Sequence, residues 1–150
     1  MNERGVIEFS RVLNVGSALL FIIAIMAVLF GLMFSLFVPI EEELIGVTVS
    51  EIRAFNTNVM DTITMLFQFG GLYLLVFGLS SCFIVLIPYR WGEKWAWYQQ
   101  LLITGLTLFG QFIIIYISSA IVPAYFLPVT IILIILWLVG LVLPVKKIFS

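Results

Sequence analysis

The chain has 150 residues, of which 63% are hydrophobic and 10% are charged, whereas soluble domains average roughly 45–50% and about 25%. Histidine is absent, which removes the commonest metal ligand and the commonest general base at neutral pH. The seven basic residues are scattered and the formal net charge is −1, so nothing favours a nucleic-acid partner, and none is expected.

The longest apolar stretch lies between Lys94 and Lys146, where 51 residues carry no ionisable side chain other than tyrosine. At helical rise this stretch would form about 75 Å of helix, more than two hydrocarbon cores of about 30 Å each. A soluble domain of this size needs no such stretch. The sequence therefore predicts a single all-α domain over residues 1–150, a polytopic membrane protein.

Apolar runs and their boundaries predict four transmembrane helices, at about 12–38, 60–87, 95–122 and 126–143. The first run is longer than the roughly 7–15 apolar residues of a signal peptide, so it is predicted to span the membrane rather than be removed. Pro123 and Pro128 interrupt the hydrogen-bond ladder and separate the third span from the fourth. Pro144 is predicted to end the fourth.

An outer loop of about 39–59 connects the first two spans. Thr48 and Glu51 have the spacing of a capping box, which predicts a short helix around 49–55 lying on the membrane surface. Asn58 is predicted to cap the second span. The acidic run 41–43 lacks the spacing of a calcium-binding loop, so no metal site is expected there.

The basic residues predict how the spans are oriented, because cytoplasmic loops carry the excess of Lys and Arg. Six of the seven lie before the first span, between the second and third, or after the fourth: Arg4, Arg11, Arg90, Lys94, Lys146 and Lys147. With four spans these segments share one side. We therefore expect an antiparallel up-down bundle with both termini in the cytoplasm, in a cell membrane, most typically a prokaryotic plasma membrane.

Aromatic and basic residues also crowd the predicted inner loop. Amphipathic rings favour the headgroup level of the bilayer. The residues expected to anchor this loop at the interface, rather than to form a ligand cage, are Tyr89, Arg90, Trp91, Lys94, Trp95 and Trp97.

The same loop carries a resemblance to a known group of proteins. The sequence Arg-Trp-Gly-Glu-Lys-Trp-Ala-Trp at 90–97 follows a glycine-bearing second span, and Phe55-Asn56 precedes that span. This pattern over residues 55–98 resembles small four-helix bacterial and archaeal membrane proteins of the DoxX-like or domain-of-unknown-function type. The resemblance implies the same four-span topology and no particular activity.

The spans contain no Asp, Glu, Lys or Arg away from their ends. Proton-coupled carriers generally need such a group inside the membrane, so proton-coupled transport by one copy of this chain is not expected. No pair of nucleophile and base is visible, and the single cysteine, Cys82, lies among apolar residues. We therefore expect no catalytic residue, no cofactor and no enzymatic activity.

A few uncharged polar side chains lie inside the second and third spans: Gln68, Tyr73, Thr107 and Gln111. The two amides, or Tyr73 and Gln111, could meet across a pair of helices. Such contacts either fix packing, which is the more common role, or line a polar pocket for a lipid headgroup or a quinone-like ligand.

Small residues recur at helical spacing on one face of each of the first two spans. They are Ser17, Ala24, Ala27, Gly31 and Ser35 in the first, and Gly71, Gly78 and Cys82 in the second. Close packing along such faces drives helix association in lipid. We expect the two faces to contact each other or a partner chain.

Three functions remain open at this stage. The first is an interaction role, as an accessory subunit of a membrane complex or a homo-oligomer. The second is binding of a lipid or isoprenoid in a pocket among the second, third and fourth spans. The third is a small oligomeric transporter or channel, for which the polar residues of the third span are few.

Overall fold

The computed structural model describes residues 3–37, 48–117 and 126–150, and these residues are helical nearly throughout. Six α-helices follow one another in the described residues: α1 (Glu3–Leu36), α2 (Val49–Phe55), α3 (Thr57–Ile84), α4 (Lys94–Gln99), α5 (Gly105–Ile117) and α6 (Phe126–Ile148). Two π-helical turns complete the long elements. The turn η2 (Val85–Tyr89) continues α3, and η3 (Gln100–Thr104) joins α4 to α5.

Four helical segments of the described chain are long and apolar enough to cross a membrane. They are Arg11–Leu36, Thr57–Tyr89, Lys94–Ile117 and Phe126–Ile148. The predicted number of spans and their approximate positions are therefore confirmed, as expected for a multi-pass membrane protein. The predicted ends at 38 and 122, the acidic run 41–43 and the proline at 123 lie outside the described residues.

The short helix of the outer loop forms as predicted, over Val49–Phe55. Thr48 and Glu51 make a complete capping box, in which the Glu51 amide donates to Thr48 Oγ1 and the Thr48 amide donates to Glu51 Oε2 at 3.0 Å. The Thr48 hydroxyl also donates to Glu51 Oε2 at 2.7 Å. The hydrogen bond from the Thr48 hydroxyl, and to a smaller extent that from the Thr48 amide, lowers the pKa of the Glu51 carboxyl, because both favour its charged form.

The predicted start of the second span is wrong by a few residues. The helix α3 begins at Thr57, and its N-cap is Asn56 rather than Asn58. The Asn56 side chain accepts a hydrogen bond from the Asn58 amide at 2.9 Å. Asn56 also ends α2 in an extended conformation, so a single residue separates the two helices.

The predicted end of the fourth span is also wrong, because α6 passes through Pro144 and continues to Ile148. A proline inside a helix removes the amide that would bond to the carbonyl four residues earlier. For Pro144 this carbonyl belongs to Gly140, and the Tyr89 hydroxyl donates to it at 2.7 Å. The helix continues because a side chain from η2 satisfies the orphaned carbonyl.

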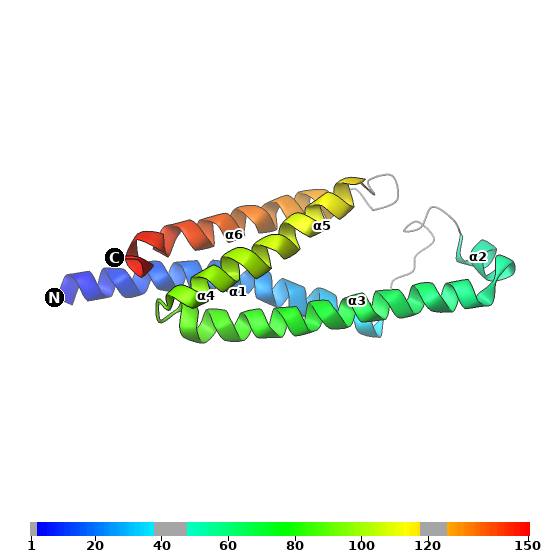
Figure 1. Ribbon diagram of the computed structural model, residues 1–150, viewed down its shortest axis with the longest axis horizontal. Coiled ribbons are helices and arrows are strands. Elements are labelled where there is room, and N and C mark those ends of the chain that lie inside the picture. The colour runs from blue at the N-terminus through cyan, green and yellow to red at the C-terminus, as the bar shows by residue number, and fades with distance from the viewer. Residues whose placement is uncertain (1–2, 38–47, 118–125) are drawn as a thin grey trace.

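The spanning helices pack as two pairs, and the two pairs meet mainly at one helix–helix interface. In one pair α1 packs along α3, in the other α5 packs along α6, and α1 also packs against α6. The start of α1, the turn between η2 and α4, and the end of α6 lie together at one end of the molecule, referred to below as the terminal end (Figure 1). Toward the opposite end, α5 and α6 separate from α3 (Figure 1).

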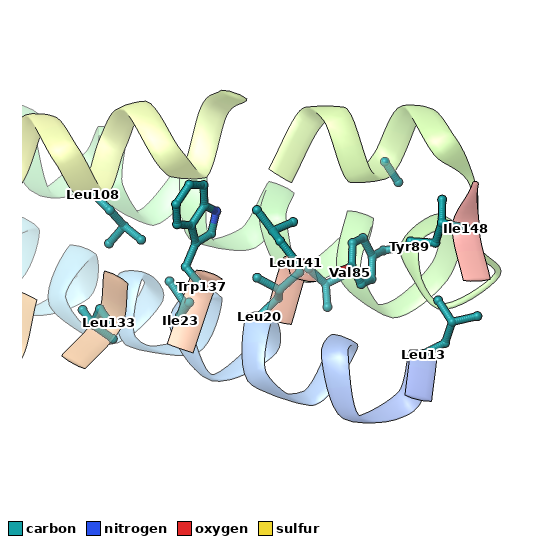
Figure 2. Close-up of a cluster of buried hydrophobic side chains, with 11 residues drawn as sticks. Leu13, Leu20, Ile23, Val85, Tyr89, Leu108, Leu133, Trp137, Leu141 and Ile148 are labelled. Carbon is teal, nitrogen blue, oxygen red and sulfur yellow. The ribbon is translucent and has the colours of Figure 1, made fainter. Parts of the chain in front are cut away.

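The buried core lies near the terminal end, where α1, η2, α4 and α6 converge. Figure 2 shows Leu20, Val85, Tyr89 and Leu141 gathered between α1, η2 and α6, with Leu13 and Ile148 at one end of the cluster. Trp137 extends the cluster toward α5, where its ring takes the space beside Gly105. At the other end of the spans the helices diverge and the core thins.

The pair α1 and α3 approaches closely at glycines. A Cβ atom at Gly78 would lie 2.7 Å from the Val28 amide nitrogen, and one at Gly31 would clash with the Leu75 backbone. A Cβ atom at Gly71 would clash with the Ser35 amide in the same way. The two small-residue faces thus meet each other within one chain, and side chains larger than hydrogen would force the backbones apart.

The other members of these two faces are buried or half-buried. Ser17, Ala24 and Ala27 are buried. Ser35 is half-buried and donates a hydrogen bond to the Gly31 carbonyl at 2.6 Å, while Cys82 is half-buried as a free thiol.

Candidate functional site

A cleft of about 650 Å³ lies between α1, α3, α5 and α6, in the half of the bundle away from the terminal end. Sites for small molecules typically measure about 300–1,000 Å³. The cleft exists because α3 and α5 are barely in contact, although both pack well against their own partners. It therefore opens between these two helices toward the surroundings of the bundle, which for spanning helices is the lipid.

The walls of the cleft are rich in phenylalanine. Phe30 and Phe34 of α1 stack with ring centroids 6.4 Å apart, and Phe34 stacks on Phe67 of α3 with centroids 6.1 Å apart. Phe77 and Phe126 add two further rings to the lining. This lining offers an apolar and aromatic surface with no charged residue among the side chains that form it.

Two glycines leave room in the cleft rather than closing a helix contact. A Cβ atom at Gly70 of α3 or Gly110 of α5 would meet no other atom within 4 Å. Both residues line the cleft. A shallower groove of about 310 Å³ continues from it along Leu66 and Gly71. Glycine in the middle of a helix is less stable than alanine by about 0.5–1 kcal/mol, so a glycine that makes no close helix contact has a cost without a packing benefit.

One polar feature lies inside this apolar lining. The Gln111 amide donates to Thr130 Oγ1 at 3.4 Å, and the buried Thr130 hydroxyl donates to the Phe126 carbonyl at 2.9 Å. Thr107 also lines the cleft, with its hydroxyl bonded to the Ile103 carbonyl at 2.8 Å. The Gln111 carbonyl oxygen has no hydrogen-bond partner among the described residues. It is therefore a free acceptor on a residue that lines an uncharged cleft.

The structure brings only half of the predicted polar set to the cleft. Thr107 and Gln111 line it, whereas Gln68 is exposed and Tyr73 is 75% exposed on α3. The contact that Gln111 could have made with Gln68 or Tyr73 is not formed, and Gln111 bonds to Thr130 instead. At about 100° per residue, Gln68 lies roughly 200° around the helix from Gly70, on the side away from the cleft.

The predicted location of the pocket is also wrong in one respect. The cleft involves α1 as well as the three later spans. The sequence does contain a signal for the α3 wall, since Phe67, Gly70, Leu74 and Phe77 recur at spacings of three and four and so share one face. Spacing alone does not distinguish such a face from an ordinary packing face.

The predicted interfacial anchors divide into two groups. Trp91 and Trp95 are exposed, at 73% and 54%, as an anchor at a membrane interface requires. Tyr89 is fully buried in the core, so its predicted exposure at the interface is wrong. Trp97 is half-buried and donates to the Leu141 carbonyl at 3.1 Å.

The basic residues of the same turn also make defined contacts. Arg90 Nε donates to Asn14 Oδ1 of α1 at 2.9 Å. The Lys94 ammonium lies 5.6 Å from the centroid of the Phe149 ring, within the range of a cation–π contact. Arg90 thus connects the turn before α4 to α1, and Lys94 at the start of α4 contacts the residue that follows α6, although both basic side chains remain exposed.

A comparison with known proteins finds no matching family model, no matching curated protein and no matching solved structure. The resemblance of the inner loop to DoxX-like proteins therefore stays a prediction. Among the described residues, no group of three or more Cys, Asp or Glu side chains is placed to hold a metal ion.

Proposed function

We propose that this membrane protein binds a lipid-like ligand, an isoprenoid or acyl chain, in the cleft between α1, α3, α5 and α6. The observation that carries the proposal is the cleft itself, about 650 Å³ in volume, lined by apolar side chains and open between α3 and α5. A ligand that already resides in the bilayer can enter sideways through this opening. The proposed role is non-enzymatic.

The polar atoms of the cleft limit the chemistry of the ligand. A charged headgroup buried against Gln111 and Thr130 would have no opposite charge to pair with, at a cost of several kcal/mol. An uncharged hydroxyl can donate to the free carbonyl oxygen of Gln111. The ligand class that fits is therefore a neutral lipid with one hydrogen-bonding group on a long apolar body.

The experiment uses the two open glycines. Gly110→Phe and Gly70→Phe should fill the cleft without disturbing neighbouring helices, because a side chain at either position begins in empty space. Leu79→Phe is the matched control, since Leu79 is 55% exposed on α3 and is absent from the lining. Native mass spectrometry after gentle extraction should show retained neutral lipid on the wild type and the control.

Both filled variants should lose most of that lipid. If they retain as much as the wild type, the lipid lies elsewhere and the proposal is wrong. Gln111→Leu tests the hydrogen bond to the ligand separately from the volume of the cleft, because it keeps a side chain of similar size and removes the amide. It should lower retention of lipid alcohols more than retention of hydrocarbons of similar length.

The second candidate is an interaction role, as an accessory subunit or a homo-oligomer. Gln68 and Tyr73 favour it, because both are exposed on a spanning helix and neither makes a hydrogen bond within the described residues. A polar group facing hydrocarbon gains from a partner, at about 0.6 kcal/mol for a typical interhelical bond. Gln68→Leu with Tyr73→Phe should then reduce the copy number or the co-purified chains seen by native mass spectrometry, and an unchanged assembly would exclude this face.

The topology belongs to the same proposal. We infer that the four spans run antiparallel, up and down, with both termini in the cytoplasm of a prokaryotic cell. The clustering of basic residues at the terminal end supports this orientation, since six of the seven Lys and Arg residues lie before, between or after the spans on that side.

A further inference from the structure

A second polar site lies at the terminal end, remote from the cleft. Its centre is the hydrogen bond from Arg90 Nε to Asn14 Oδ1, which spans from the end of η2 to α1 at 2.9 Å. The bond uses one N–H of the guanidinium and fixes its position. It leaves the terminal guanidinium nitrogens and the Asn14 amide nitrogen without partners among the described residues.

A second basic residue, Arg11, lies about one helical turn before Asn14 on α1. Arg11 precedes Asn14 by three residues on α1, so the two side chains project from the same face of the helix. Arg11 and Arg90 are both exposed, and neither forms an ion pair with a described side chain. Glu93, the carboxylate nearest to Arg90 in the chain, is exposed and forms no ion pair with a described side chain.

Arg90 bonds to Asn14 and Arg11 lies one turn before Asn14, so two positive charges belong to one region of the surface, and an anion bound there would reduce their repulsion. Arg11 and Arg90 are also the charged residues that bound two spans, so they lie where the apolar run meets the phosphate level of the bilayer. Guanidinium groups bind phosphate oxygens through paired N–H donors. The exposed Trp91, next to Arg90, suits the same interfacial depth.

We propose that Arg90, Asn14 and Arg11 bind the phosphate group of an anionic phospholipid in the leaflet at the terminal end. Arg90 and Arg11 supply the positive charge, and the Asn14 amide adds a neutral donor while its oxygen holds Arg90 in place. The site is independent of the cleft and does not rest on the ligand proposed there.

The experiment measures lipid preference in the full-length protein. The chain is placed in nanodiscs with equal amounts of phosphatidylglycerol and phosphatidylcholine, and the lipids retained after gentle extraction are counted by native mass spectrometry. The wild type should be enriched in phosphatidylglycerol. Arg90→Gln should reduce the enrichment about tenfold, as expected when charge-assisted hydrogen bonds are lost.

Two variants separate a built site from attraction by net charge. Lys146→Gln removes one positive charge from the same end, at an exposed residue without a hydrogen bond, and should change the enrichment little. Asn14→Ala leaves the net charge unchanged and should still reduce the enrichment clearly. The proposal is wrong if Asn14→Ala behaves as the wild type, or if Lys146→Gln loses as much as Arg90→Gln.

A final arm distinguishes a lipid from a free phosphate. Inorganic phosphate at millimolar concentration should fail to displace phosphatidylglycerol, because the acyl chains add apolar contacts that the free ion lacks. Displacement by inorganic phosphate would overturn the lipid as the source. Thermal unfolding of each variant in the same detergent checks that the fold is intact, and the exposed positions of Arg90 and Asn14 predict little change.

Discussion

At the scale of single residues, aromatic donors satisfy main-chain carbonyls where the helices leave regular geometry. Tyr89 donates to Gly140 beside Pro144, and Trp97 donates to the next carbonyl, that of Leu141. Trp137 donates to the Gln100 carbonyl at 3.0 Å, at the start of η3. Bulk water is not available to a carbonyl inside a bilayer, so donors from neighbouring helices are one way to satisfy it.

Tyr89→Phe should destabilise the protein by about 1 kcal/mol, between the average interhelical bond in membranes and the cost of a buried orphan acceptor. The change removes the hydroxyl and leaves the Gly140 carbonyl without a donor, because Pro144 has no N–H. Unfolding in mixed micelles of increasing denaturing detergent measures the difference.

Tyr73→Phe is the matched control, because Tyr73 is 75% exposed and forms no hydrogen bond within the described chain. It should leave stability unchanged. Pro144→Ala would restore an amide to the Gly140 carbonyl, so the cost of Tyr89→Phe should be smaller in that background. An equal cost in both backgrounds would show that the hydroxyl acts through something other than this carbonyl.

At the scale of helices, adjacent glycines of α3 have opposite roles. Gly71 lies against the Ser35 backbone of α1, whereas Gly70 faces the open cleft. Gly71→Ala should destabilise the pair α1 and α3 by about 1–3 kcal/mol, since the new methyl group overlaps a backbone that has no room to yield. Gly70→Ala should be neutral or stabilising by up to about 1 kcal/mol. The same unfolding assay compares the two variants, and equal effects would contradict the packing seen between these helices.

The existence and approximate limits of the spans could be predicted from the sequence, because long apolar runs are a strong signal and tolerate errors of a few residues. The helix at Val49–Phe55 was predictable for a different reason, since its capping box is local. The end of α6 was not, because the effect of Pro144 depends on a hydrogen bond to the Gly140 carbonyl from Tyr89, which lies 51 residues before Gly140 in the chain. A local rule for proline cannot contain that partner.

The candidate site was predictable only in part. Gln111 and Thr107 stood out as polar residues in an apolar span, but which helices they face depends on how α5 and α6 pair. The burial of Tyr89 and the exposure of Trp91 illustrate the same limit, since both residues belong to one aromatic cluster in the sequence. Rotation of each helix about its axis is set by packing, and composition does not encode it locally.

At the scale of the whole molecule, the arrangement in two pairs separates stability from binding. The core and the irregular turns lie toward the terminal end, where α1, η2, α4 and α6 converge. The opposite half is held mainly by the glycine contacts of α1 with α3 and by the pairing of α5 with α6. Because α1 and α6 provide the main contact between the two pairs in this half, a cleft opens between α3 and α5 without loss of the core.

This arrangement also makes a prediction about sidedness, for which the single cysteine is convenient. With Cys82 replaced by Ser, new cysteines at Trp91 and Ser150 should react with a membrane-impermeant maleimide only from the cytoplasmic side, because both residues belong to segments at the terminal end, which the proposed topology places in the cytoplasm. A cysteine at Ser50, in the exposed helix α2, should react only from the opposite side. Labelling of intact cells and of inverted vesicles separates the two. If the cysteines at positions 91 and 150 are labelled from opposite sides of the membrane, the chain does not have four spans. If all three cysteines are labelled from the side opposite to the one expected, the four spans remain and only the orientation expected from the basic residues is wrong.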